Sequence, residues 1–150
     1  MPVMEIRKAG DRVLKEIAAP VEKIDRKIKH LLDDMAETMY AADGVGLAAP
    51  QVGASLQLVV IDVGEGIIEL INPKIVACEG CEIATEGCLS VPGMFGEVER
   101  YATVTVEAQN RAGKMFRISG SGLLARALQH ETDHLKGILF IELAKTIHKG

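Results

Sequence analysis

Two histidines with four-residue spacing are the chemically most informative feature of the sequence. His130 and His134 enclose the tripeptide Glu-Thr-Asp, so the segment has the form His-Glu-x-x-His. In a helix, residues four apart lie on one face, which allows both imidazoles to bind one metal ion. Glu131 is then close enough to exchange a proton with a metal-bound water without being a ligand itself. The alternative is a pair of surface histidines on an amphipathic helix, but the leucines that flank the motif indicate burial.

A third metal ligand is required, and the sequence contains candidates on both sides of the histidines. Upstream, Cys88 lies in the segment Glu-Gly-Cys-Leu-Ser, ahead of a Pro-Gly pair that favours a chain bend. A thiolate and two imidazoles leave one tetrahedral position open for water, which is the arrangement of a catalytic site. Downstream, Glu142 or His148 are the alternatives, as in zinc peptidases that take their third ligand after the histidine helix. Considered alone, Cys88 would be typical of a buried free thiol.

A segment of small residues at 44–51 is the third feature of interest, with the sequence Gly-Val-Gly-Leu-Ala-Ala-Pro-Gln. Its glycines and alanines allow another backbone to approach closely, and Gln51 provides an uncharged amide donor. The segment does not match a phosphate-binding loop, because no Lys-Ser/Thr pair follows it. In isolation it would be interpreted as an ordinary connection between a helix and a strand.

The pattern of apolar residues predicts the elements that must position these side chains. We expect an amphipathic helix over residues 25–42, ended by Gly44, and a second helix over 122–135 that carries both histidines. Ser119 or Ser121 is expected to cap the second helix, and Gly137 to end it. Strands are expected at 56–63, 67–76, 98–108 and 115–118, with a turn at 110–114. This order predicts an α+β fold, with mostly antiparallel sheets packed around a central metal-binding helix and an N-terminal amphipathic helix.

Composition and charge restrict the class of protein. The 150 residues are 48% hydrophobic and 25% charged, which predicts one globular domain over residues 1–150 rather than a disordered chain. A net charge of −4 provides no electrostatic footprint for nucleic acid or an anionic membrane. The N-terminal residues do not have the pattern of a secretory signal, and no apolar run has membrane-spanning length. We therefore expect a protein of the reducing cytoplasm, where three cysteines, an odd number, are not a disulfide framework.

Together, the three segments resemble the peptide deformylase family. The signature of that family is Gly-apolar-Gly-apolar-Ala-Ala-x-Gln, then Glu-Gly-Cys-apolar-Ser, then His-Glu-apolar-Asp-His. The chain matches these motifs in the same order at 44–51, 86–90 and 130–134. The resemblance extends between the motifs and covers essentially the whole chain. Three ordered motifs are far more specific than a His-Glu-x-x-His match alone.

The resemblance implies a metal-dependent hydrolase that removes the formyl group from the initiator methionine of new bacterial polypeptides and releases formate. Cys88, His130 and His134 are implied to hold one divalent metal ion, with water as the fourth ligand. The family favours Fe²⁺ and accepts Ni²⁺, Co²⁺ or Zn²⁺. Glu131 is implied to take a proton as the metal-bound water attacks the formyl carbon, and then to deliver it to the departing amine.

Other residues receive supporting roles from the same resemblance. The side-chain amide of Gln51 and the backbone N–H of Leu89 are implied to stabilise the oxyanion that forms on the formyl oxygen. Asp133 is expected to hold a ligand histidine or a nearby backbone in place. The segment Val45-Gly46 is expected to pair with an extended peptide as an added strand.

The expected partners are N-formylmethionyl peptides and nascent chains. Leu123 and Ala127 lie seven and three residues before His130, so all three share a helical face and the first two are expected to line the methionine pocket with Val45. The alternative for Leu123 and Ala127 is simple core packing. Some bacterial members dock on the ribosome through a longer C-terminal helix, whereas this chain has few residues after Phe140. Ribosome association is therefore left open.

Four positions depart from the family pattern or are not explained by it. Thr132 replaces an apolar residue of the helix motif, and its hydroxyl is expected to bond back to the helix. Phe95 occupies a position where arginine is common among close relatives. Cys78 and Cys81 form a Cys-x-x-Cys pair, which we interpret as two ordinary thiols beside a turn because no second pair or βαβ context accompanies them.

Two competing functions differ in what they require of the chain. A zinc peptidase would use the same helix with Glu142 or His148 as third ligand, so it would not need Cys88. A binding or metal-storage module would keep the fold without catalysis. The presence of Glu131 and Gln51 together argues against such a module, because only catalysis requires both an acid/base and an oxyanion donor.

Overall fold

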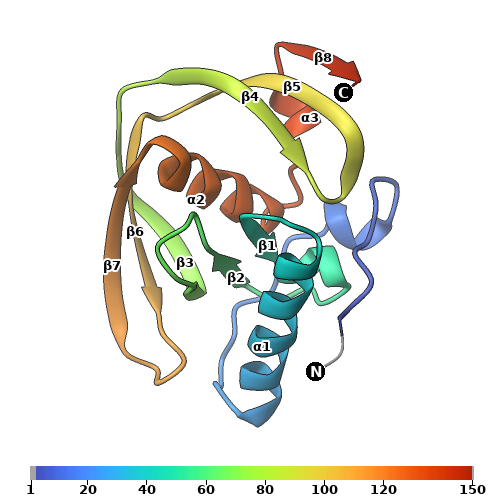
Figure 1. The fold of residues 1–150 in the computed structure, drawn as a ribbon. Coiled ribbons are helices and arrows are strands. Elements are labelled where there is room, and N and C mark those ends of the chain that lie inside the picture. Colours follow the sequence, from blue (N-terminus) through green and yellow to red (C-terminus); the bar gives the residue numbers. More distant parts are fainter. Residues whose placement is uncertain (1–2, 150) are drawn as a thin grey trace.

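Two antiparallel sheets enclose a central helix in the computed structural model, which describes residues 3–149 (Figure 1). The larger sheet has the strand order β1-β2-β3-β6-β7, and the smaller one has the order β4-β5-β8. The predicted α+β class with antiparallel sheets is therefore confirmed. In chain order the elements are the 3-10 helix η1 (Arg12–Lys15), α1 (Arg26–Ala41), β1 (Gly46–Ala48), the 3-10 helix η2 (Ala49–Val52), β2 (Leu58–Ile61), β3 (Ile68–Glu79), β4 (Glu82–Cys88), β5 (Val91–Arg100), β6 (Thr103–Gln109), β7 (Met115–Ser121), α2 (Gly122–His134), α3 (Phe140–Leu143) and β8 (Thr146–Lys149).

Strand β2 separates two apolar clusters that anchor the helices. Val59 and Ile61 pack in the cluster that contains the buried alanines and leucine of α2. Leu58 and Val60 pack in the other cluster, which contains the buried side chains of α1. Successive side chains of a strand point to opposite faces, so the four-residue apolar run of β2 is buried on both sides. The two long helices are thus held on opposite faces of the larger sheet.

Helix α1 begins at a side-chain cap and ends in a tight turn. The Asp25 carboxylate accepts a hydrogen bond from the Ile28 N–H at 3.1 Å, which satisfies one of the free amides of the first turn. After Ala41, the Gly44 N–H donates to the Met39 carbonyl at 2.9 Å. This turn directs the chain into β1, an edge strand of the larger sheet. Residues 44–51, expected to be a loop, therefore contain a short strand and a 3-10 helix.

Helix α2 starts without a side-chain cap, contrary to the sequence-based prediction. Ser121 occupies the N-cap position in extended conformation but makes no capping hydrogen bond. Ser119 also does not cap the helix, because its hydroxyl is hydrogen-bonded to Thr105 on the neighbouring strand at 2.7 Å. Both serines belong to β7, which pairs with β6 up to Ser121, so the helix follows the strand directly.

The strand predicted at 98–108 is in fact two strands in different sheets. β5 ends at Arg100 and pairs with β4, whereas β6 begins at Thr103 and pairs with β3. At the break, the Tyr101 N–H donates to Gln129 Oε1 at 2.9 Å and the Gln129 Nε2 donates to the Tyr101 carbonyl at 2.9 Å. The side chain of Gln129 on α2 thus takes the place of a strand partner for Tyr101. The alternation of apolar residues continues from β5 into β6, although the two strands belong to different sheets.

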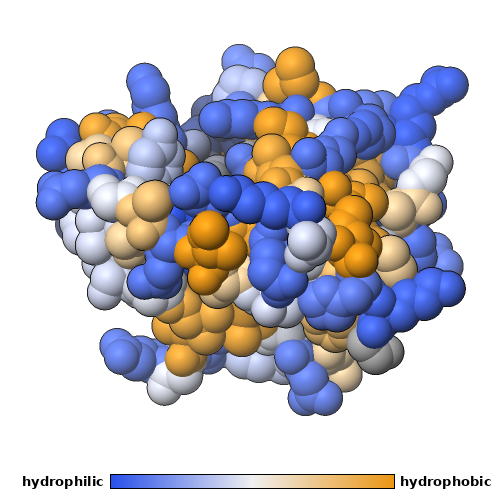
Figure 2. All heavy atoms as spheres, turned by 90° about the horizontal axis from the view of Figure 1, so that it is seen from above, coloured by the Kyte–Doolittle hydropathy of each residue, from blue (hydrophilic) through white to orange (hydrophobic). Residues whose placement is uncertain are grey.

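The smaller sheet covers the other side of α2. Its apolar core consists of Leu14, Val91, Val98, Leu139 and Phe140. The last described residues form β8, which pairs with β5 rather than extending as a helix. Figure 2 views the molecule from above and shows hydrophobic patches broken up by hydrophilic side chains. Among residues 3–149, no helix combines the length and apolar character needed to cross a membrane.

Gly137 ends helix α2 in a conformation that few residues other than glycine adopt. Its φ is +77°, and the Ile138 N–H donates across it to the Asp133 carbonyl at 2.9 Å, as in a Schellman motif. A Cβ at this position would lie 2.5 Å from the Lys15 carbonyl oxygen. The chain therefore passes η1 too closely for any side chain at this point.

We predict that Gly137→Ala lowers the free energy of unfolding by more than the left-handed backbone alone would cost, which is about 1–2 kcal/mol. Urea denaturation measures the loss. Gly93→Ala is the matched control, because Gly93 has the same φ of +77° but an added Cβ meets nothing within 4 Å. Equal losses in the two variants would show that the contact with η1 is unimportant.

Candidate metal centre

The structure brings the three predicted metal ligands together. Cys88 is the last residue of β4, while His130 and His134 lie one turn apart on α2. Their ligand atoms all lie within 4.8 Å of one another, and the Cys88 Sγ is 3.3 Å from the His134 Nε2. His134 is only 1% exposed. The three side chains thus form a compact donor set, in which His134 is fully buried and Cys88 is half-buried.

The downstream alternatives for the third ligand lie elsewhere. The Glu142 carboxylate accepts hydrogen bonds from the Lys15 ammonium and the Leu139 N–H, at the start of α3. His148 lies on β8, with its ring stacked against Phe95 at a centroid distance of 6.3 Å. Within residues 3–149, the cysteine and two histidines are the single group of three or more His, Cys, Asp or Glu side chains arranged to hold a metal ion.

The chemistry of the donor set fits a transition-metal cation. A thiolate and two imidazoles are ligands that suit Fe²⁺, Co²⁺, Ni²⁺ and Zn²⁺. Burial disfavours a charged His130, but the hydrogen bonds with Cys88 and Glu86 outweigh it and raise the pKa of His130 to about 10. Burial, together with the charge of His130, holds the pKa of His134 well below its usual value. The negative groups around His130 therefore favour positive charge at this point, and a bound metal cation would supply that charge with both imidazoles neutral.

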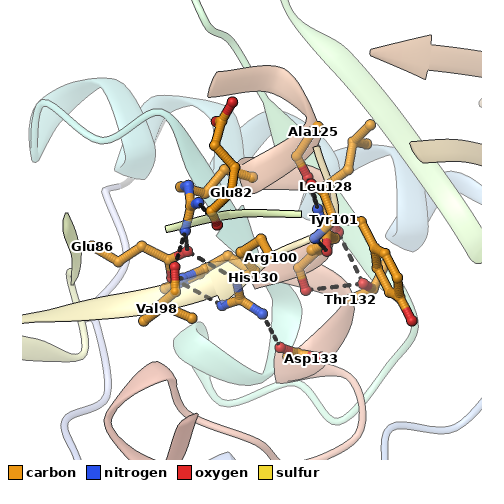
Figure 3. Close-up of polar contacts among 12 residues, drawn as sticks. Glu82, Glu86, Val98, Arg100, Tyr101, Ala125, Leu128, His130, Thr132 and Asp133 are labelled. Atoms are coloured by element: carbon orange, nitrogen blue, oxygen red, sulfur yellow. Dashed lines mark hydrogen bonds and ion pairs between the residues drawn. The ribbon is translucent and has the colours of Figure 1, made fainter. Parts of the chain in front are cut away.

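A buried carboxylate orients the first histidine. The His130 Nδ1 donates to Glu86 Oε1 at 2.9 Å (Figure 3). The Nε2 is then the nitrogen available to a metal ion. The Arg100 guanidinium donates to both oxygens of Glu86, at 2.8 and 2.9 Å, and Arg126 donates to Oε2 at 2.7 Å. Burial alone would raise the pKa of Glu86, but the hydrogen bonds from Arg100 and His130 hold it well below its usual range. Glu86 is therefore ionised and fixes the imidazole ring.

The sequence-based prediction was that Asp133 holds a ligand histidine or a nearby backbone in place, whereas in the structure Glu86 contacts the histidine. Asp133 accepts from the Arg100 Nη1 at 2.5 Å and is connected to the site only through that arginine (Figure 3). Sequence reasoning missed the roles of Glu86, Arg100 and Arg126. The signal for Glu86 was present, because it belongs to the same five-residue motif as Cys88.

Two polar residues of α2 bond to main-chain carbonyls of their own helix. Thr132 Oγ1 donates to the Leu128 and Gln129 carbonyls at 2.9 and 3.0 Å, which confirms that its hydroxyl bonds back to the helix (Figure 3). Gln129 Nε2 also donates to the Ala125 carbonyl at 2.9 Å. The polar substitution at Thr132 is therefore accommodated without disturbing the adjacent ligands.

Glu131 lies beside the donor set as a buried carboxylate that forms no ion pair within residues 3–149. Burial is the main cause that raises the pKa of Glu131 to about 7. Its Oε1 is buried and has no hydrogen-bond partner among the described residues. A carboxyl group with a pKa near neutrality can both accept and donate a proton at physiological pH.

Gln51 directs its amide group at the same site. Its Oε1 accepts from the Ala48 N–H at 2.9 Å, which fixes the orientation of the amide. Its Nε2 donates to the Ser90 hydroxyl at 3.1 Å and lies 3.6 Å from the Cys88 Sγ. Leu89 follows Cys88 directly, and its side chain packs against Gly44 at the start of the small-residue segment.

A cavity of about 460 Å³ opens over this site and is lined by all four residues predicted to contact the substrate. Val45 and Gly46 line it from the side of β1, and Leu123 and Ala127 from α2. Leu123 is 53% exposed, so core packing does not explain it, whereas Ala127 also belongs to the core cluster under the helix. Phe95 lines the cavity from β5.

An open coordination position beside a carboxylate is typical of metal-dependent hydrolases. The family model described as polypeptide deformylase matches residues 3–150. The chain therefore belongs to the peptide deformylase family, whose members are metal-dependent hydrolases, and the resemblance inferred from the three motifs is confirmed.

Relatives and solved structures agree with this assignment. The peptide deformylase of Pelotomaculum thermopropionicum is 56% identical over 149 residues, which is 99% of this chain and 96% of that protein. The peptide deformylase of Alkaliphilus metalliredigens is 60% identical over 142 residues, or 95% and 97% of the two chains. The crystal structure of peptide deformylase from Thermotoga maritima superimposes with a TM-score of 0.95 at 45% identity, covering 97% of this chain and 100% of that one.

We predict that Gly46→Ala lowers kcat by displacing Glu131 while leaving metal content unchanged. A Cβ at Gly46 would lie 2.6 Å from Glu131 Oε2, and a displacement of about 1 Å in a catalytic group costs about 10²-fold in rate. Deformylase kinetics and metal analysis on the same preparation test this. Gly120→Ala is the control, because its Cβ would be equally close, 2.6 Å, to the flexible Leu124 side chain away from the site. Wild-type kcat in Gly46→Ala would contradict the prediction.

Proposed function

We propose that this chain, as a single catalytic domain over residues 1–150, removes the N-formyl group from the initiator methionine of nascent polypeptides and releases formate. The observation that carries the proposal is the convergence of the Cys88, His130 and His134 donor atoms beside the buried Glu131 carboxylate. The site lies at a cavity whose walls can accept a methionine side chain. Nascent chains as substrate imply that the protein acts in the cytoplasm.

Cys88, His130 and His134 on β4 and α2 would hold the metal ion. A divalent metal ion bound there supplies a Lewis acid and lowers the pKa of a coordinated water toward neutrality. We propose Fe²⁺ as the physiological ion, as the family resemblance implies. Ni²⁺, Co²⁺ or Zn²⁺ could substitute for it, because thiolate and imidazole ligands accept all four. Metal analysis of anaerobically purified protein tests the identity, and an excess of another metal over iron would contradict it.

Glu131 is the proposed general acid and base. Its carboxylate takes a proton from the attacking water as the new C–O bond forms, and later donates that proton to the amine as the C–N bond breaks. The pKa of about 7 suits both steps, because neither protonation state is strongly disfavoured at neutral pH. The Gln51 amide and the Leu89 N–H are proposed to donate hydrogen bonds to the formyl oxygen as negative charge develops on it.

Substrate binding is proposed to use the edge of the larger sheet. β1 is the terminal strand of that sheet, so an extended peptide can pair with the main chain of Val45 and Gly46. Main-chain pairing does not depend on the side chains of the peptide, so the site would accept substrates with different residues after methionine. The methionine side chain would lie in the cavity, against Leu123, Ala127 and Val45.

Formate release from a formyl-Met-Ala-Ser peptide by anaerobic, iron-loaded protein is the decisive measurement. We expect activity in the wild type and none in Cys88→Ser or Glu131→Ala, because one variant lacks a ligand and the other lacks the acid/base. Metal analysis separates the roles, since only Cys88→Ser should lose metal. No formate from the metal-replete wild type would refute the proposed function. Full metal content in Cys88→Ser would refute the ligand set.

Gln51→Glu tests the oxyanion role of the amide. The replacement keeps an acceptor for the Ala48 N–H but removes the Nε2 donor. We expect kcat to fall by about 10²–10³-fold, the usual effect of losing one oxyanion donor, with little change in KM. Ser90→Ala is the control, because it removes the hydroxyl partner of Gln51 and leaves the amide in place. A raised KM with unchanged kcat would instead assign Gln51 to ground-state binding.

A further inference from the structure

The three metal ligands belong to two different layers of the fold. Both histidines lie on α2, whose apolar face packs on the larger sheet. Cys88 ends β4, which belongs to the smaller sheet. The distance from the Cys88 thiolate to the two imidazoles therefore depends on how β4 is held against α2. Contacts within β4 or within α2 alone cannot determine that distance.

Arg126 makes this connection from the helix side. It lies four residues before His130, so the two side chains project from the same face of α2. Its Nη1 donates to Glu86 Oε2 at 2.7 Å and to the Val98 carbonyl at 2.9 Å. Its Nη2 donates to the Glu82 carbonyl at 2.9 Å. One guanidinium thus joins α2 to the main chains of both β4 and β5 and to a side chain two residues before Cys88 (Figure 3).

The main-chain bonds distinguish Arg126 from Arg100. Arg100 lies on β5 and contacts only carboxylates, those of Glu86 and Asp133. Those carboxylates can follow a displaced strand by rotating. The carbonyls of Glu82 and Val98 belong to the sheet itself, so bonds to them fix the position of the strands relative to α2. The Arg126 side chain is 10% exposed, which keeps water from competing for these bonds.

We propose that Arg126 is a positioning residue that sets the separation of Cys88 from the two histidines and thereby the affinity of the site for a divalent metal. The inference rests on the proposed function for its ligand set. Arg126 also lines the cavity. A methionine at this position would keep the stem of the side chain and lose all three polar contacts.

Co²⁺ binding to metal-free protein, measured by competition with a chelator, tests the proposal without substrate. We expect Arg126→Met to weaken Co²⁺ binding by about 10–100-fold, the range found when residues that support metal ligands are replaced. The visible spectrum of the Co²⁺ form should also change, because the geometry of the ligands is altered. Arg117→Met is the control, since Arg117 pairs with Glu107 on the surface of the larger sheet and should leave both readouts unchanged.

The kinetic signature separates positioning from pocket lining. In Arg126→Met, the retained stem should leave KM for the formyl peptide close to the wild-type value, while kcat falls at saturating metal. If Arg126→Met folds, as judged by thermal unfolding of the metal-free protein, and binds Co²⁺ as tightly as the wild type, the proposal is overturned.

A second variant covers the possibility that Arg126→Met does not fold. Arg126→Lys keeps the charge beside Glu86 but cannot reach all three acceptors, so we expect weakened Co²⁺ binding in a folded protein. Unchanged Co²⁺ binding in Arg126→Lys would overturn the proposal. Because Co²⁺ binding needs no substrate, absence of formate release in the wild type overturns the proposed function, while weakened Co²⁺ binding in the variants still supports this inference.

Discussion

The buried carboxylate of Glu86 is the interaction on which the rest of the site depends. An isolated charge in this position would cost several kcal/mol, because it is removed from water. Glu86 avoids that cost through contacts with Arg100, Arg126 and His130. With Asp133 on the far side of Arg100, two carboxylates and two guanidinium groups balance in charge. Glu86 and Arg100 lie on strands of the smaller sheet, whereas Arg126, His130 and Asp133 lie on α2, so the network can form only when the sheet and the helix have come together.

The two buried carboxylates of the site, Glu86 and Glu131, differ in the direction in which their surroundings shift the pKa. Glu86 is surrounded by donors, and its pKa lies well below the usual range. Glu131 is equally buried but has no cation hydrogen-bonded to it among residues 3–149, and burial, which outweighs the charges of His130 and Arg100, raises its pKa to about 7. Environments that move two acids apart in this way commonly separate a structural charge from a group that transfers protons. Here one carboxylate orients a ligand, and the other is available for chemistry.

Close backbone approach is the second constraint on the site. Gly46 leaves room for the Glu131 carboxylate, and the edge strand β1 can therefore lie directly beside the metal ligands. The turn after α1 and the short β2 run, buried on both faces, hold that edge in position. The cavity is consequently lined by regular elements, namely β1, α2, the end of β4 and the start of β5.

Relations within one element were determined by the sequence alone. The helical period places His130 and His134 on one face whatever surrounds them, and the position of Gly137 ends that helix. Alternating apolar residues were enough to predict antiparallel sheets. Motif order was enough to identify the family, because three separated segments rarely match together by chance.

Relations between elements were decided only by the tertiary structure. Local spacing left Cys88, Glu142 and His148 open as the third ligand, and the family resemblance implied Cys88; its position beside the histidines depends on β4 packing against α2. The break at Tyr101 depends on Gln129, which is 28 residues away and takes the place of a strand partner. Glu86 rather than Asp133 holds the histidine, because strand β4 brings it to the ring while Arg100 engages Asp133. Such contacts depend on packing and register across the whole chain, so local spacing does not specify which side chains meet.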